Sequence, residues 1–113
     1  MKNYSSDKIK KYDKRPGLVG TFVHGDSLSL THWAFAKDAV LAPHSHHNEQ
    51  ITYVVSGAIS FDREGGEPLV ARAGDFVVFA PNETHGGKAL EDTIAIDAFS
   101  PAREDFKKEM ENA

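Results

Sequence analysis

The sequence contains no cysteine among its 113 residues. This absence excludes disulfide bridges, thiolate metal ligands and cysteine nucleophiles, and it fits a reducing compartment. There is no apolar run long enough to cross a bilayer and no signal-type apolar core near the N-terminus, so we expect a cytoplasmic protein with no membrane partner. The net charge of −4 argues against nucleic acid as a partner.

The composition is otherwise that of an ordinary globular domain, with 40% hydrophobic and 27% charged residues. This length and composition predict one domain over residues 18–113 with a core that needs no staples. Residues 1–17 are polar and basic and end in an Arg-Pro-Gly turn, which predicts a separate N-terminal arm. We interpret the arm as solvated or paired along a sheet edge or a partner subunit, with RNA or membrane binding as the alternative.

From Leu18 onward the chain has the pattern of many short strands. Apolar, β-branched or alternating runs are separated by Gly, Pro and Asp, which predicts an all-β barrel or sandwich. After the last strand, Pro101 begins a charged segment that predicts a short amphipathic helix up to Met110. The expected strands span residues 18–23, 28–35, 39–43, 50–55, 58–62, 68–71, 76–79 and 93–100, with one more beginning at His85.

Residues 43–57 carry the strongest functional signal. His44 and His46 are two positions apart, so on an extended strand both imidazoles point to the same face. Gln50 lies in step with one face of the strand that follows. Glu49 is the better metal ligand by charge, but strand alternation places it on the opposite face. The pattern therefore favours Gln50 as the ligand that accompanies the two histidines.

His85 follows a Pro-Asn turn and completes a candidate metal site of His44, His46, Gln50 and His85. Imidazole and amide oxygen together suit a divalent transition metal such as Ni, Zn, Fe, Mn or Co. These ligands are neutral, so the ion would keep its full charge, act as a strong Lewis acid and attract anionic ligands.

The other three histidines are interpreted as structural or surface residues. His24 and His47 fall out of step with the ligand pattern and are expected on the surface. His32 shares a strand face with Leu28 and Leu30, which favours an interior histidine, with a pocket-lining residue as the alternative.

The strand expected over residues 93–100 places an acid on a face of mostly small residues. We interpret Asp97 as a pocket carboxylate that shares its face with Phe99, the alternatives being a buried structural carboxylate or a surface one. Arg103 lies just beyond the strand, where it is able to pair a carboxylate bidentately. Taken alone, it is better explained by a surface salt bridge with its acidic neighbours. The opposite strand face is wholly apolar and is expected to meet the core: Ile94, Ile96 and Ala98.

Two stretches in the right order resemble the motifs of the cupin family. The pattern His44-x-His46-x3-Gln50-x6-Gly57 resembles the first motif, with Gln where Glu is usual. Residues 74–85 resemble the second motif, with Ala80 where a proline is common. The resemblance implies an all-β double-stranded β-helix, an RmlC-like jelly-roll barrel, carrying the short C-terminal helix. It also implies a metal inside the barrel mouth and a homodimer.

Residues 89–106 resemble the C-terminal signature of KdgF-type cupins of pectin degradation, and Gln50 in place of Glu fits that group. Those proteins convert the unsaturated monouronates left by pectate or alginate lyases into open-chain keto-uronates. The resemblance implies catalytic roles for Asp97, Phe99 and Arg103 and a small anionic sugar as substrate. We therefore expect a metal-dependent enzyme that linearises 4,5-unsaturated monouronates.

Other functions are consistent with the same residues. A metal-dependent oxygenase cupin would more often include a carboxylate ligand, so Gln50 counts against it, and oxygen uptake with bound iron would indicate it. A sugar- or metal-binding cupin without turnover would bind its ligand and release no product. A storage or structural cupin is disfavoured by the three ligand histidines, and no DNA-binding segment accompanies the barrel.

Overall fold

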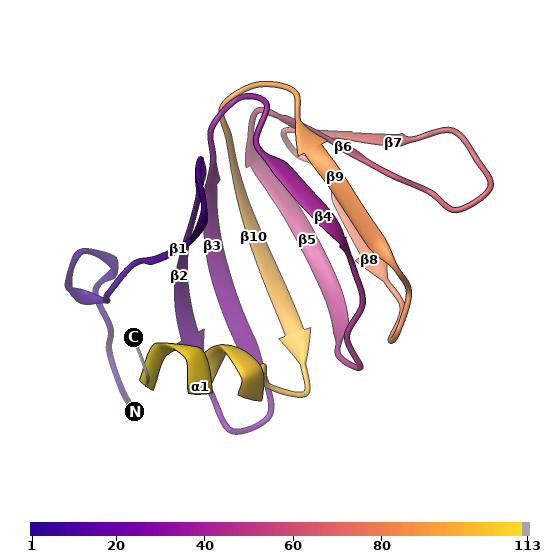
Figure 1. Cartoon of the computed structure of the whole chain (residues 1–113). Helices are drawn as coiled ribbons and strands as arrows, with labels where there is room; N and C mark the ends of the chain where they lie inside the picture. The colour runs from indigo at the N-terminus through magenta and orange to yellow at the C-terminus, as the bar shows by residue number, and fades with distance from the viewer. Residues whose placement is uncertain (112–113) are drawn as a thin grey trace.

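The computed structural model describes residues 1–111, with only the backbone of Lys14, Met110 and Glu111. Within this range ten strands follow a short 3-10 turn, and one helix follows the strands (Figure 1). The elements are η1 (Ser6–Lys8), β1 (Tyr12–Arg15), β2 (Leu18–His24), β3 (Ser29–Phe35), β4 (Val40–His44), β5 (Glu49–Ser56), β6 (Ala58–Phe61), β7 (Leu69–Arg72), β8 (Phe76–Phe79), β9 (His85–Ala89), β10 (Thr93–Ser100) and α1 (Glu104–Glu111).

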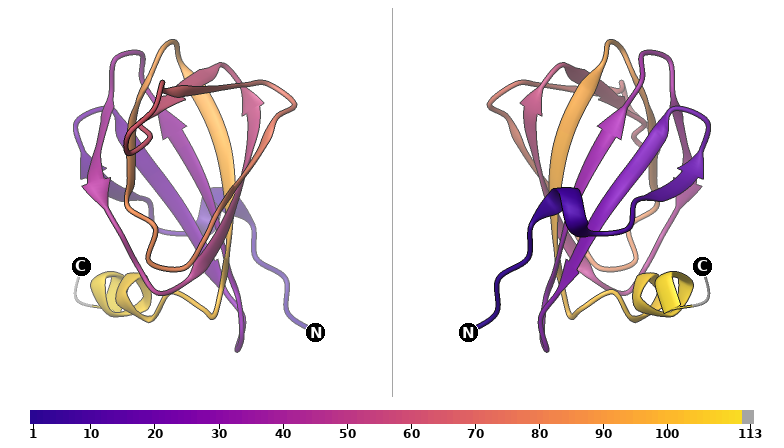
Figure 2. Two further views of the ribbon diagram at one scale, coloured as in Figure 1. Left: turned by 90° about the vertical axis from the view of Figure 1, so that its right-hand side faces the viewer. Right: turned by 90° about the vertical axis from the view of Figure 1, so that its left-hand side faces the viewer.

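The strands form two antiparallel sheets, one in the order β1-β2-β3-β10-β5-β8 and one in the order β4-β9-β6-β7. In the side views of Figure 2 the sheets lean together and enclose the interior. Strands distant in sequence are neighbours, as β3 and β10 are. The prediction of an all-β double-stranded β-helix barrel with a short C-terminal helix is confirmed. Among the described residues, no helix has the length and apolar character needed to cross a membrane.

The first strand, β1, pairs with β2 at the edge of the larger sheet, where Asp13 lies opposite Val19. Figure 2 shows the preceding segment running along the outside of the barrel on this side. Part of the basic segment therefore lies along a sheet edge. This placement agrees with one of the two interpretations of the segment.

Helix α1 is attached to the barrel through one aromatic side chain. Phe106 is buried and stacks on Phe22 with ring centroids 4.6 Å apart, and it forms a T-shaped pair with Trp33 with centroids 6.2 Å apart. An eight-residue helix is not stable alone in water, and burial of a Phe side chain stabilises it by about 1.5–3 kcal/mol. The helix crosses the lower ends of β2, β3 and β10 (Figure 1), so it brings residues 103–106 to the barrel mouth.

Strand β10 lies in the middle of the larger sheet, and the expectation that its apolar residues face the core is wrong. Its inward residues are Thr93, Ala95, Asp97 and Phe99, which are all buried. His32 pairs with Ile96 on the outward side and is exposed, so the expectation of an interior histidine is also wrong. We call the outward-pointing apolar side of this sheet the outer face, comprising Leu30, Ile51, Tyr53, Phe76, Val78, Ile94, Ile96 and Ala98.

Candidate metal centre and active site

Three histidines converge at one end of the barrel. His44 ends β4 and lies directly opposite His85, the first residue of β9, while His46 lies in the loop between β4 and β5. One ring nitrogen of each histidine lies within 4.8 Å of those of the other two. The sequence-predicted trio is therefore brought together by the β4–β9 pairing, and it is compatible with a divalent metal.

Backbone carbonyls fix the tautomer of all three rings. A carbonyl oxygen only accepts, so each Nδ1 must be the protonated nitrogen and each Nε2 of the neutral ring keeps its lone pair. Metal-binding histidines commonly have this arrangement. The partners are the carbonyl of Ala42 for His44 at 2.9 Å, that of Asn48 for His46 at 3.0 Å and that of Glu83 for His85 at 3.0 Å.

Gln50 turns its carbonyl oxygen toward this cluster. Its Nε2 donates to Thr52 Oγ1 at 2.9 Å, while its Oε1 lies 3.0 Å from His46 Nε2. Burial, together with the charge of Arg103, lowers the pKa of His46, so both atoms in this contact carry lone pairs. Two ligands about 2.1 Å from one ion and at a right angle are about 3.0 Å apart. The donor set thus fits a divalent metal held by the three histidines and Gln50.

Asp97 lies on the inward face of β10, where it is 8% exposed. The Thr52 hydroxyl donates to its Oδ1 at 2.6 Å. Burial raises the pKa of Asp97 to about 6, although hydrogen bonds from Thr52 and Trp33 and the charge of Arg103 act in the opposite direction. A carboxyl group with such a pKa is able to hold and release a proton near neutral pH.

Arg103 is buried at 6% exposure. Its guanidinium lies 3.7 Å from the ring centroid of Phe106 and 4.6 Å from that of Phe99. Asp105 accepts from Nε at 3.0 Å and from Nη2 at 2.7 Å. The salt bridge considered as the alternative therefore exists, but the arginine is not at the surface. Among the described side chains no hydrogen-bond partner is found for Nη1, so this end is available to an anion.

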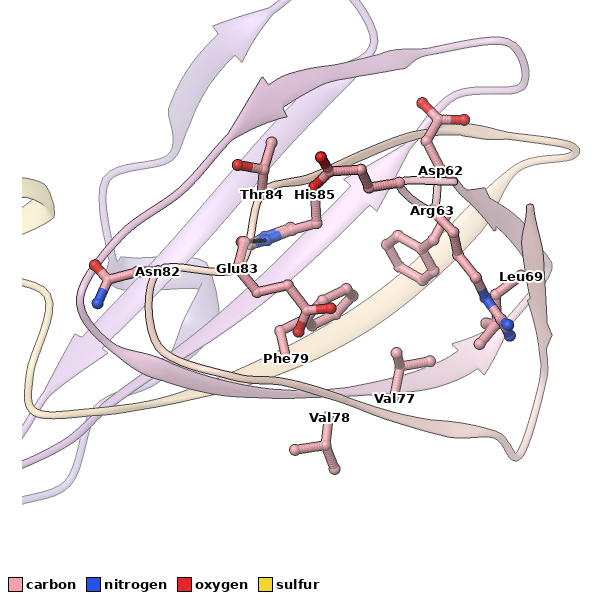
Figure 3. Close-up of a pocket in the computed structure, with 12 residues that line it drawn as sticks. Asp62, Arg63, Leu69, Val77, Val78, Phe79, Asn82, Glu83, Thr84 and His85 are labelled. Atoms are coloured by element: carbon pink, nitrogen blue, oxygen red, sulfur yellow. Dashed lines mark hydrogen bonds between the residues drawn. The ribbon is translucent and has the colours of Figure 1, made fainter. Parts of the chain in front are cut away.

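Three cavities border on His85, and their volumes are about 50, 320 and 520 Å³. The inner cavity, of about 50 Å³, is bounded by the side chains of Gln50, Asp97 and Arg103 as well. It has room for about one or two waters. The outer cavity, of about 520 Å³, has an apolar floor that includes Phe79 and a charged rim. Figure 3 shows Asn82 at one end of the outer cavity, Arg63 and Leu69 at the other, and His85 between them.

A family model described as "Cupin domain" matches residues 31–97 of the sequence. The chain belongs to the cupin family. The match includes all of the histidine cluster, Gln50 and Asp97, whereas Phe99 and Arg103 lie beyond its end.

Two of its relatives carry the name KdgF. This cupin is 40% identical over 83 residues to the "Pectin degradation protein KdgF" of Dickeya dadantii, covering 72% of this chain and 74% of that protein. The structure of KdgF from Halomonas sp. is similar with a TM-score of 0.82 and 36% identity, covering 91% of this chain and 97% of that one. The structure of an RmlC-like cupin from Shewanella frigidimarina is similar with a TM-score of 0.83 and 32% identity, covering 91% of this chain and 93% of that one.

Sequence reasoning missed two polar residues of this cupin's site. Asn48 is buried and donates from Nδ2 to the carbonyl of Pro101 at 2.6 Å, which ties the histidine loop to the segment before α1. Thr52 links Gln50 to Asp97. Thr52 shares the strand parity of Gln50, so alternation along β5 was the signal that indicated its inward side chain. Asn48 lies in the loop before β5, where alternation gives no signal.

The remaining histidines lie away from the cluster. His47 is exposed, as expected. His24 is only half-buried rather than on the open surface, because its Nδ1 contacts the buried Ser29 hydroxyl at 2.6 Å.

Proposed function

We propose that this cupin is a metal-dependent enzyme that linearises 4,5-unsaturated monouronates, derived from pectin or alginate, to keto-uronates. The observation that carries the proposal is Asp97, a buried carboxyl group with a pKa of about 6 that is hydrogen-bonded through Thr52 and Gln50 toward the histidine cluster. The 40% identity to a pectin degradation protein supports it. Ring opening of an anionic sugar needs a group that moves protons, a metal site and a cation that binds the carboxylate. Asp97, the histidine cluster and the buried Arg103 are able to supply these three functions.

The proposed reaction is an isomerisation in which no proton is gained or lost overall. The bond between C1 and the ring oxygen breaks, the C1 hydroxyl loses its proton to give an aldehyde, and the ring oxygen takes a proton to give an enol. The enol then becomes a ketone when C4 gains a proton and the hydroxyl loses one. Asp97 would move a proton in ring opening or in this tautomerisation.

The other site residues would bind and orient the sugar. His44, His46, His85 and Gln50 would hold a divalent metal, which supplies Lewis-acid polarisation of a substrate oxygen. Arg103 would pair the substrate carboxylate through its Nη1 end, because Asp105 already holds the Nε side.

Phe99 would form an apolar wall beside the sugar ring. Its own ring lies 5.5 Å from that of His46, centroid to centroid. A sugar ring is larger than the inner cavity, which has a volume of about 50 Å³. We therefore place the sugar at the barrel mouth, with Asp97 facing it from the inner side of β10.

The test is a turnover assay with lyase-generated unsaturated monouronates, following loss of the ultraviolet absorbance of the conjugated double bond. We expect faster decay with the wild-type protein and none above background with Asp97→Ala. Arg103→Lys should raise KM about 10–100-fold, because a lysine pairs a carboxylate at one point only. Arg63→Lys, at the rim of the outer cavity, is the matched control and should leave KM unchanged.

Three outcomes contradict the proposal. Decay no faster than in buffer, with metal confirmed bound, would exclude uronate linearisation. Oxygen uptake with bound iron would indicate an oxygenase. Tight uronate binding without product would indicate a sugar-binding cupin.

We further propose that the protein is a homodimer that associates through the outer face. Phe76 and Val78 on this face are 69% and 62% exposed, and Leu30 and Ile51 flank Ala98 on neighbouring strands. The apolar residues that define this face carry no charge, and His32 and Glu49 are exposed on the same side of the sheet. A two-fold axis through the apolar residues brings these uncharged side chains together. An apolar surface that spans several strands is typical of a stable interface.

The dimer is tested by light scattering after size-exclusion chromatography. We expect twice the monomer mass for the wild type and the monomer mass for Ile51→Glu, because the interface would have to bury an unpaired charge. Val70→Glu is the matched control, since Val70 is similarly exposed but lies in the other sheet. A wild-type protein with monomer mass at micromolar concentration would contradict the proposal.

A further inference from the structure

One buried hydroxyl connects the proposed proton carrier to the proposed amide ligand. Thr52 Oγ1 donates to Asp97 Oδ1 at 2.6 Å and accepts from Gln50 Nε2 at 2.9 Å. Thr52 is only 2% exposed, so water does not compete for either bond. A hydroxyl has a single proton. Because the carboxylate takes that proton, the oxygen presents only lone pairs to Gln50.

The sheet places these three side chains in register. Thr52 lies directly opposite Asp97 in the β5–β10 ladder, and Gln50 lies opposite Phe99. All point to the inner side of the sheet, because strand residues two apart share a face. Threonine is β-branched, which restricts its χ1 angle. Because β5 is paired with a strand on each side, the position of the Thr52 hydroxyl is set by a fixed backbone.

An amide ligand, unlike a carboxylate, must be oriented. A glutamate presents an oxygen in either orientation of its end group, whereas a glutamine presents either an oxygen or an NH₂ group, which has no lone pair to offer a metal. In this structure the NH₂ group donates to Thr52 Oγ1 at 2.9 Å and also interacts with the Asp97 carboxylate, while the oxygen lies 3.0 Å from His46 Nε2. An amide turned the other way would point its N–H groups at the histidine cluster and place two acceptors, Oε1 and Thr52 Oγ1, against each other.

We propose that Thr52 is the positioning residue that holds Gln50 with its carbonyl oxygen toward the metal. The inference rests on the ligand set of the proposed function and adds to it a reason why Gln50 is able to replace the usual glutamate of the first cupin motif. It predicts that metal affinity depends on the Thr52 hydroxyl only as long as residue 50 is an amide.

Thr31 provides a matched control on the other side of Asp97. It lies opposite Asp97 in the β3–β10 ladder and is 1% exposed, and no hydrogen-bond partner for its hydroxyl is found among the described residues. It therefore shares the residue type, the burial and the neighbour of Thr52, but it lies outside the chain of hydrogen bonds to Gln50.

The experiment is a titration of the metal-free protein with Co²⁺, followed by visible absorbance and by competition with a chelator. Thr52→Val removes the hydroxyl at nearly constant volume and should weaken Co²⁺ binding about 10–100-fold, as loss of an outer-shell partner does. Thr52→Ser should bind within about threefold of the wild type, since it keeps the hydroxyl. Thr31→Val should bind as the wild type does. Thermal melts of the metal-free variants check that each is folded.

A double-mutant cycle makes the test specific for amide orientation. In a Gln50→Glu background, Thr52→Val should change Co²⁺ affinity by less than about threefold, because either carboxylate oxygen can face the metal. Equal losses in the wild-type and Gln50→Glu backgrounds would overturn the inference, as would wild-type affinity in Thr52→Val or an equal loss in Thr31→Val. A wild-type protein that binds no Co²⁺ would overturn it together with the ligand set.

The titration uses no sugar, so it separates this inference from the uronate reaction. A failed turnover assay combined with weakened Co²⁺ binding in Thr52→Val would reject the substrate class and leave the role of Thr52 in place.

Discussion

Asp97→Asn is expected to abolish turnover and, in the metal-free protein, to increase stability at pH 8. An amide of nearly the same shape cannot exchange the proton, so kcat should fall by about 10²–10⁴-fold, the usual contribution of general acid–base catalysis. The gain in stability has a separate cause. Burial raises the pKa of Asp97 to about 6, so the folded protein holds an ionised carboxylate at pH 8 in a place that disfavours its charge.

The sign of the pH dependence follows from the two pKa values of Asp97. The folded-state pKa of about 6 lies above the ordinary value of 3.8, so between these values the folded state binds more protons than the unfolded chain. The free energy of unfolding therefore falls as the pH rises from about 4 to about 6 and stays lower above that range. The cost amounts to about 3 kcal/mol at pH 8, and asparagine does not incur it.

Urea unfolding of the chelator-treated proteins measures this difference. We expect Asp97→Asn to be more stable than the wild type by up to about 3 kcal/mol at pH 8 and by clearly less at pH 5. Asp26→Asn is the control, because Asp26 is exposed in the turn between β2 and β3. A lower stability of Asp97→Asn than of the wild type at pH 8 would show that the carboxylate stabilises the fold. It would contradict the view that the carboxylate destabilises the protein and is kept for function.

His46→Ala is expected to remove most of the metal-dependent stabilisation. A metal that binds only the folded protein raises the free energy of unfolding by about 2.7 kcal/mol at 100 times its dissociation constant. His46 supplies one of three Nε2 lone pairs and contacts Gln50, so its removal takes away a ligand and the neighbour of a second. The increase in melting temperature on adding Ni²⁺, Zn²⁺ or Co²⁺ should nearly vanish.

His47→Ala is the matched control for this prediction. The two histidines are adjacent in the same loop, but His47 is exposed and lies outside the cluster. Metal should therefore raise the melting temperature of His47→Ala as much as that of the wild type. Equal metal-induced shifts in His46→Ala and His47→Ala would show that the bound ion sits elsewhere. Both variants should melt like the wild type in the presence of a chelator.

Strand alternation, read from the sequence, predicted the local half of the candidate site. The spacing of His44 and His46 and the parity of Gln50 against Glu49 depend only on strand alternation, which is a property of neighbouring residues in one chain. The second relation holds in the structure, where Gln50 is buried and Glu49 is exposed. The first does not rest on alternation there, because His46 lies in the loop after β4, and that loop brings it to His44. The parity that groups Asp97 with Phe99 on one side of β10 holds for the same reason.

Tertiary structure alone decided which side of each strand faces inward. Alternation along β10 separates Asp97 from Ile96 but does not say which of them meets the core. Hydrophobicity favours the wrong side, because the apolar Ile94, Ile96 and Ala98 lie half-buried on the outer face while Asp97 is buried on the inner side. Apolar strand faces meet either the core or another surface, and only the partner strands and sheets decide between them.

The contacts between distant segments were likewise decided by the fold. His85 meets His44 because β4 pairs with β9, and Thr52 meets Asp97 because β5 pairs with β10. Arg103 is buried because Phe106 anchors α1 across the barrel mouth, a position that the acidic neighbours of Arg103 in the sequence do not indicate. Side-chain alternation is short-range and readable from one strand, whereas pairing between strands and burial depend on residues tens of positions apart.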